Sequence, residues 1–248
     1  MLGPSVHVLW FISLLLEIAV LVCALYRRAF ARYLALNLYI LCSLILTVGL
    51  ELCRRGFGIA SFTYFLGYYC SNSLLCILKY FVIVQLYRLV FAKTDIGKEI
   101  RAAAALLLAA TAMFSYVFVQ HSQGHHLTAR FVVELEQNLN FLGVVLVYLL
   151  WGAMLKLRET RTRLIQFCLA LGIYFSATAG TYALRNLFPS LEPAVLRCIP
   201  LIAETLLSLA WAYTYLMVPE EARLATAPLA FRLPGQSPPR APQMVNAR

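Results

Sequence analysis

Seven long apolar runs constrain this chain more than any other feature. A helix needs roughly 20 mostly apolar residues to cross a bilayer. Runs of about that length occupy residues 6–26, 33–53, 62–89, 102–120, 131–155, 164–184 and 196–218. The runs are continuous and lack the ten-residue alternation of a transmembrane barrel. The sequence therefore predicts an all-α fold, a polytopic transmembrane bundle of seven helices.

The composition favours a membrane protein over a soluble one. Only 13% of the 248 residues are charged and 62% are hydrophobic, whereas soluble proteins carry about a quarter charged residues. The net charge of +10 does not indicate nucleic-acid binding, because the basic residues gather at the ends of the apolar runs. We therefore expect the lipid bilayer, and no nucleic acid, as the main partner.

The distribution of basic residues predicts the orientation. The loops after the first, third, fifth and seventh runs carry twelve lysines and arginines, and the alternate loops carry five. The positive-inside rule then places the N-terminus outside and the C-terminus in the cytoplasm. We expect a seven-helix domain over residues 1–218 in a bacterial inner membrane. Residues 219–248 are rich in proline and polar residues, which predicts a disordered cytoplasmic tail.

Four polar side chains within the apolar runs predict an intramembrane cluster: Glu17, Asn72, Lys79 and Glu204. Lys79 and Glu17 lie nine and ten residues before basic residues that end their runs, so both have a similar depth. An unpaired charge at the bilayer centre costs at least about 2.5–3.5 kcal/mol. We therefore expect Glu17 to pair with Lys79. The pair is either structural, part of a ligand pocket, or part of a transport path.

A second group of polar residues falls at the predicted outer ends of the helices. It comprises His121, His125, His126, Arg130, Glu134, Gln137, Asn138 and Arg197. The histidines lack the ligand spacing of a zinc motif, so we expect a ligand entrance here and no metal. Nothing in the sequence implies a cofactor.

Small residues predict close helix packing. Gly172, Ser176 and Gly180 recur at four-residue spacing, a pattern that lets helices approach closely within a bundle or in a homo-oligomer. The alanine-rich stretch 102–112 predicts a similar contact. Cys53 and Cys198 fall at the same predicted outer side, where a disulfide is one possibility.

The functional expectation rests mainly on what the sequence lacks. It contains no GxSxG, HExxH or glycine-rich phosphate loop, so we expect no enzymatic activity. Its helix count and length resemble those of the seven-helix sensor modules that precede bacterial kinases. The first hypothesis is a sensor or accessory module with an outer polar mouth and an inner face that contacts a cytoplasmic or membrane signalling partner. The alternative is a small-solute or proton-coupled transporter that uses Glu17, Lys79 and Glu204.

Overall fold

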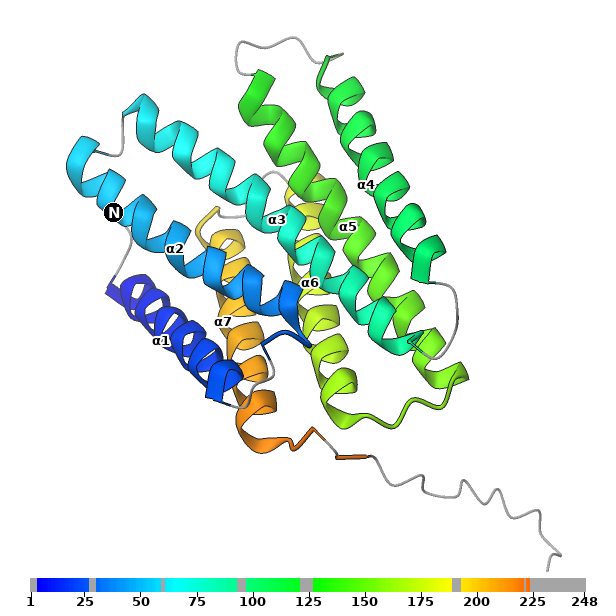
Figure 1. Cartoon of the computed structure of the whole chain (residues 1–248). Helices are drawn as coiled ribbons and strands as arrows, with labels where there is room; N and C mark the ends of the chain where they lie inside the picture. The colour runs from blue at the N-terminus through cyan, green and yellow to red at the C-terminus, as the bar shows by residue number, and fades with distance from the viewer. Residues whose placement is uncertain are drawn as a thin grey trace, which may run out of the picture.

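The chain forms seven helices in a computed structural model, which describes residues 4–26, 30–58, 61–92, 97–120, 127–188, 193–220 and 222–223. The helices are α1 (Pro4–Tyr26), α2 (Leu34–Phe57), α3 (Phe62–Val90), α4 (Gly97–Gln120), α5 (Leu127–Lys156), α6 (Thr162–Leu187) and α7 (Pro193–Met217) (Figure 1). Each predicted run coincides with one helix to within a few residues. The predicted all-helical fold is confirmed.

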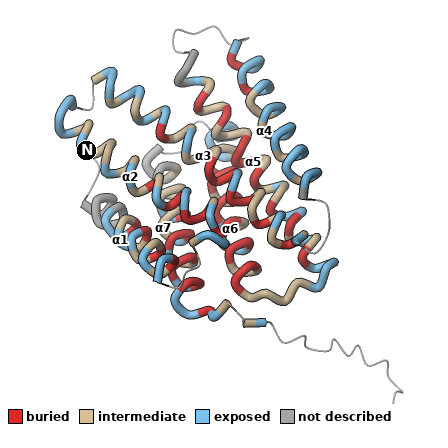
Figure 2. Tube along the Cα trace, in the orientation of Figure 1, coloured by how far each residue is buried: buried red, intermediate tan, exposed pale blue. Residues whose placement is uncertain are grey.

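Six of the helices, α2 to α7, are long and apolar enough to cross a membrane. The described side chains of α1 cover only Phe11–Tyr26, which is apolar but shorter than a span. Large apolar side chains are exposed, for example Ile45, Phe114 and Tyr148. Exposed positions lie along the outer sides of the helices (Figure 2). An apolar exterior of this extent is stable in lipid rather than in water. These features support a multi-pass membrane protein.

Six helices form a ring, and α4 lies outside it. Each helix in the order α1, α2, α3, α5, α6, α7 contacts the next one, and α7 closes the ring against α1. Among the described residues, helix α4 packs on α5 and α3 and on no other helix, at the edge of the bundle (Figure 1). Consequently α3 and α5 are neighbours that run in the same direction. We call the end where α3, α5 and α7 begin the mouth end, and the opposite end the tail end.

The tail half of the ring is filled by aromatic side chains. Tyr33 packs edge-on against Phe167 and Tyr215, with ring centroids 5.0 and 6.1 Å apart. Trp211 packs edge-on against Tyr39 at 5.9 Å. Phe167, Tyr215 and Trp211 have at most 1% of their surface exposed. We call these five side chains the aromatic layer; such packing leaves little room for water.

Polar contacts fasten the loop between α5 and α6 at the tail end. Both carboxylate oxygens of Glu159 accept hydrogen bonds from the Arg161 guanidinium, at 2.8 and 2.6 Å. Arg161 also donates to the Leu89 carbonyl at 2.8 Å, which joins this loop to the end of α3. The hydrogen bonds from Arg161 lower the pKa of Glu159 from 4.5 to about 2. The loop is therefore held by a charged clamp at neutral pH.

A buried arginine fastens the chain beyond α7. Arg163, 3% exposed, donates to the Val218 carbonyl at 2.6 Å and lies 3.7 Å from Glu220. Glu220 also pairs with Arg32 at 2.5 Å. The first described residues of the predicted tail thus contact the bundle. The rest of that tail lies outside the described residues.

The predicted packing signals have mixed outcomes. A Cβ added at Gly172 would lie 3.2 Å from Val147 of α5, so this glycine serves a contact within the bundle. One added at Gly180 would have no neighbour within 4 Å, and Ser176 is half-buried. Most alanines of α4 are exposed, so they make little contact within the bundle, and the contact across a dimer stays a prediction. The disulfide considered is absent, because Cys53 and Cys198 are both free thiols.

Candidate functional site

A cavity of about 750 Å³ lies between α3, α5, α6 and α7. It extends from Tyr68 and Phe188 near the mouth end to Lys79 and Glu204 near the middle of the helices. Its volume falls in the range of roughly 300–1,000 Å³ that is typical of small-molecule sites. Its lining mixes charged, amide, hydroxyl and aromatic side chains. The cavity therefore suits a polar organic molecule.

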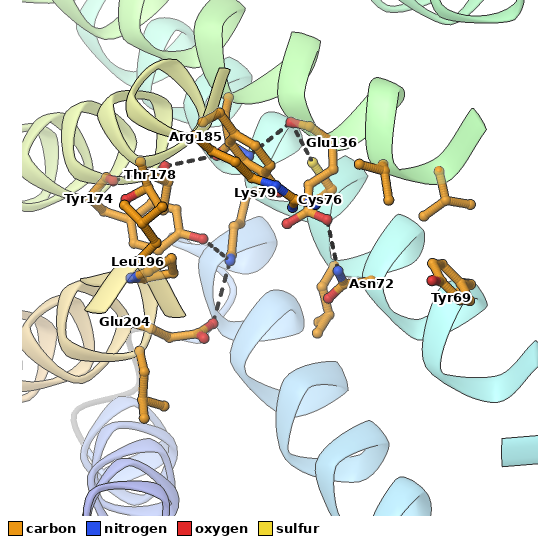
Figure 3. A pocket seen from close by; sticks show the side chains of 18 of the residues that line it. Tyr69, Asn72, Cys76, Lys79, Glu136, Tyr174, Thr178, Arg185, Leu196 and Glu204 are labelled. Atoms are coloured by element: carbon orange, nitrogen blue, oxygen red, sulfur yellow. Dashed lines mark hydrogen bonds and ion pairs between the residues drawn. The ribbon is translucent and has the colours of Figure 1, made fainter. Parts of the chain in front are cut away.

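Lys79 forms the floor of this cavity. Its ammonium donates a hydrogen bond to the Tyr174 hydroxyl and lies 3.4 Å from a Glu204 carboxylate oxygen. It also lies 4.3 Å from the centroid of the Tyr174 ring, within the range of a cation–π contact. Lys79, Tyr174 and Glu204 point toward one another from α3, α6 and α7 (Figure 3). One ammonium thus ties three helices together.

Glu204 connects this floor to the aromatic layer. Its Oε1 accepts a hydrogen bond from the Tyr39 hydroxyl at 3.0 Å. The Tyr39 ring contacts Trp211, which is 1% exposed. The cavity therefore meets packed aromatic side chains on the tail side, and its lining extends toward the mouth end as far as Tyr68 and Phe188.

Glu136 of α5 forms one wall. Its Oε2 accepts a hydrogen bond from Asn72 Nδ2 at 2.8 Å, and the Tyr182 phenol faces the same carboxylate. The Asn140 amide donates to the Glu136 carbonyl at 2.8 Å and accepts from Thr178 at 3.0 Å. These contacts orient the wall through α3, α5 and α6. A preorganised carboxylate of this kind suits recognition of a cation or a hydrogen-bond donor.

The structure gives Lys79 a different partner from the one predicted. Glu17 accepts a hydrogen bond from Ser43 at 3.0 Å, and among the described residues no cation lies within 4 Å of its carboxylate. The reason is the helix order, because α1 packs on α2 and α7 but not on α3. Glu204 takes the place expected for Glu17. Asn72, Lys79 and Glu204 line the cavity, and Glu17 does not.

Of the outer polar residues that the sequence analysis selected, those with described side chains are not among the residues that line the cavity. His121, His125 and His126, and the Arg197 side chain, lie outside the described residues. Arg130 is exposed, Glu134 and Gln137 are half-buried, and Asn138 donates to Ser115 of α4 at 3.0 Å.

Several residues that form the cavity were not among the site residues selected from the sequence: Glu136, Asn140, Tyr174, Tyr182 and Arg185. Val132, Glu136 and Asn140 recur every four residues, and this spacing is a signal of one helix face.

The part of the chain with described side chains contains no group of three histidine, cysteine or acidic residues placed to hold a metal. Comparison of the chain with protein-family models, with curated proteins and with solved structures found no match. The site is therefore interpreted from its own geometry.

Proposed function

We propose that the chain is a seven-span membrane protein that binds a small polar solute and acts as a receptor-like or accessory module. In this proposal the N-terminus and the mouth end face outward, and the tail end faces the cytoplasm of a bacterial cell. The observation that carries the proposal is the cavity, whose lining extends from the mouth end to the Lys79 floor, beside packed aromatic side chains.

The contacts of Lys79 at the floor of the cavity could couple solute binding to a change in helix packing. Lys79, Tyr174, Glu204 and Tyr39 come from four different helices and depend on one another for hydrogen bonds. A solute that competes for Lys79 or Glu204 changes the contacts between these helices. A ligand shifts a conformational equilibrium only through such a difference in affinity. The proposed readout is the tail-end surface, where a signalling partner would bind.

Transport is the second candidate. Lys79 and Glu204 lie near the middle of their helices, and charged side chains at that depth are typical of solute and proton paths. A transporter must also open the aromatic layer toward the tail end.

Cysteine accessibility tests the proposed function and separates the two candidates. The seven native cysteines are first replaced, and one cysteine is introduced as Thr181→Cys in the cavity wall. Thr111→Cys is the matched control, because each hydroxyl donates to the carbonyl four residues earlier, and Thr111 lies on α4 away from the cavity. A charged, membrane-impermeant thiol reagent is then added to right-side-out or inverted vesicles.

For a receptor-like module, we expect modification of Thr181→Cys from the outer side only and little modification of Thr111→Cys. Modification of Thr181→Cys from both sides favours the transporter. Modification from the inner side alone contradicts the proposed orientation, and no modification from either side contradicts a solute-accessible cavity.

A further inference from the structure

We propose that the ligand of this cavity is a small zwitterion, with its ammonium on Glu136 and its carboxylate on Arg185. This assignment rests on the proposed function and adds the chemical class of the solute.

Among the residues with described side chains, four charged ones line the cavity, and they divide into one pair and two single charges. Lys79 and Glu204 lie 3.4 Å apart and neutralise each other. Glu136 is contacted by neutral donors, and among the described residues neither it nor Arg185 has an ion-pair partner. One carboxylate and one guanidinium therefore remain for a ligand.

The two single charges lie on the same side of the cavity. Tyr182 faces the Glu136 carboxylate, and Arg185 follows Tyr182 by three residues on α6. Residues three apart share a helix face, and three residues rise about 4.5 Å along the axis. Arg185 therefore lies about one helical turn closer to the mouth end than Tyr182, which contacts Glu136. A ligand that enters with its cationic end first can therefore place its ammonium on the deeper Glu136 and its carboxylate on Arg185 near the mouth.

Both groups suit the proposed ends of the ligand. A guanidinium binds a carboxylate through two parallel hydrogen bonds. Near Glu136, the cavity is lined by Tyr68, Tyr69 and Tyr182, and aromatic faces favour an ammonium.

Net charge argues against a simple ion. The described charged side chains of the cavity sum to zero. A singly charged ligand would leave either the half-buried Glu136 or the exposed Arg185 without a partner. The unpaired charge is the less favourable at Glu136, because that carboxylate is the more desolvated of the two. A zwitterion adds no net charge and supplies both missing partners.

The test is thermal unfolding of the full chain in lipid nanodiscs with a graded set of ligands. The zwitterions are glycine, glycine betaine, 4-aminobutyrate and 6-aminohexanoate, and the singly charged comparators are hexylamine and hexanoate. We expect at least one zwitterion to raise the melting temperature, because a ligand stabilises the state that binds it. We expect neither comparator to do so at the same concentration.

Two variants test the contacts. Glu136→Gln and Arg185→Gln are each expected to weaken zwitterion binding at least tenfold. Arg185→Gln should also gain affinity for hexylamine, and Glu136→Gln for hexanoate, which no misfolded variant would show. Arg88→Gln, exposed at the tail end, is the control and should bind as the parent does.

Equal stabilisation by hexylamine or hexanoate would show a site for a single ion, which overturns the zwitterion but leaves solute binding intact. If none of the six compounds raises the melting temperature, the zwitterion assignment is also overturned. The labelling of Thr181→Cys then decides separately whether the cavity admits solutes.

Discussion

The Lys79 ammonium and the Glu204 carboxylate lie 3.4 Å apart and join α3 to α7 at the floor of the cavity. The Lys79 side chain is 10% exposed and the Glu204 side chain 34% exposed, so the pair is shielded on the lysine side and reaches the cavity on the other. This relationship makes the pair both a structural contact and a part of the site.

Breaking this pair is expected to destabilise the protein. Lys79→Met or Glu204→Gln should each cost about 3 kcal/mol, the lower end of the range for a buried pair that loses one partner. The double variant should cost clearly less than the sum, because neither charge is then left alone. Denaturant unfolding of the four proteins in nanodiscs measures the coupling.

Glu17 provides the control for this cycle. Since its hydrogen bond goes to Ser43 rather than to Lys79, Glu17→Gln should be coupled to Lys79→Met more weakly than Glu204→Gln is. A larger coupling to Glu17 than to Glu204 would contradict the pairing in the structure.

Gly143 is expected to tolerate no side chain. A Cβ at this position would lie 2.6 Å from the ring of Phe175, which is 2% exposed and has little room to move. Gly143→Ala should therefore destabilise the protein by about 1–3 kcal/mol. Gly152→Ala on the same helix is the matched control, because its Cβ has no neighbour within 4 Å. That control should be neutral or slightly stabilising, since alanine is the better helix former. Thermal unfolding compares the two, and equal effects would refute the close contact between α5 and α6.

The Glu159 clamp is expected to make stability depend on pH. Its pKa is about 2 in the folded protein against an ordinary 4.5, so its contribution is fully present above pH 4.5 and is lost as the pH falls toward 2. Glu159→Gln should lower the unfolding free energy by about 2 kcal/mol at pH 7, the scale of hydrogen bonds to a charged group.

The measurement is the difference in stability between the parent and Glu159→Gln across this pH range. The difference should shrink as the pH falls from 4.5 to 2, while the difference for the exposed Glu99→Gln stays small throughout. A pH-independent difference for Glu159→Gln would mean that its charge does not hold the loop.

Arg163 is expected to matter far more than its exposed neighbours at the tail end. Arg163→Met removes the bond to the Val218 carbonyl and leaves the buried side of Glu220 with one cation fewer. The expected cost is about 3 kcal/mol. Arg88→Met, which alters an exposed side chain at the same end, should change stability by less than about 0.5 kcal/mol. Chemical unfolding of the two variants side by side is the measurement. Similar values would contradict a stabilising role for the Arg163 contacts with Val218 and Glu220.

The positions of the helices were predictable because a span has a required length and composition. The partner of Lys79 was not. Counting residues gives depth along the axis, and Glu17 and Glu204 both lie at a depth that Lys79 reaches. The choice between them depends on which helices adjoin α3, and this follows from the ring order rather than from any local pattern.

Glu136 was not selected as a cavity residue for a related reason. The first half of α5 is polar, which is typical of a helix end at the membrane surface. Glu134, Gln137 and Asn138 were therefore selected with the loop histidines. The described contacts divide this stretch by face: Glu136 and Asn140 turn to the cavity, and Asn138 turns to α4. Counting in fours from Val132 separates the two faces, but only once the neighbours of α5 are known.

The parallel course of α3 and α5 has a consequence for how the chain tolerates change. The chain leaves α3 at the tail end and must cross the bilayer again before α5 begins, and α4 makes this return journey without joining the ring. Its sequence is constrained by the thickness of the membrane and by its contacts with α3 and α5, and none of its described residues lines the cavity. An unrelated apolar crossing grafted in its place should preserve solute recognition, which makes α4 the natural position for a reporter or a fused anchor.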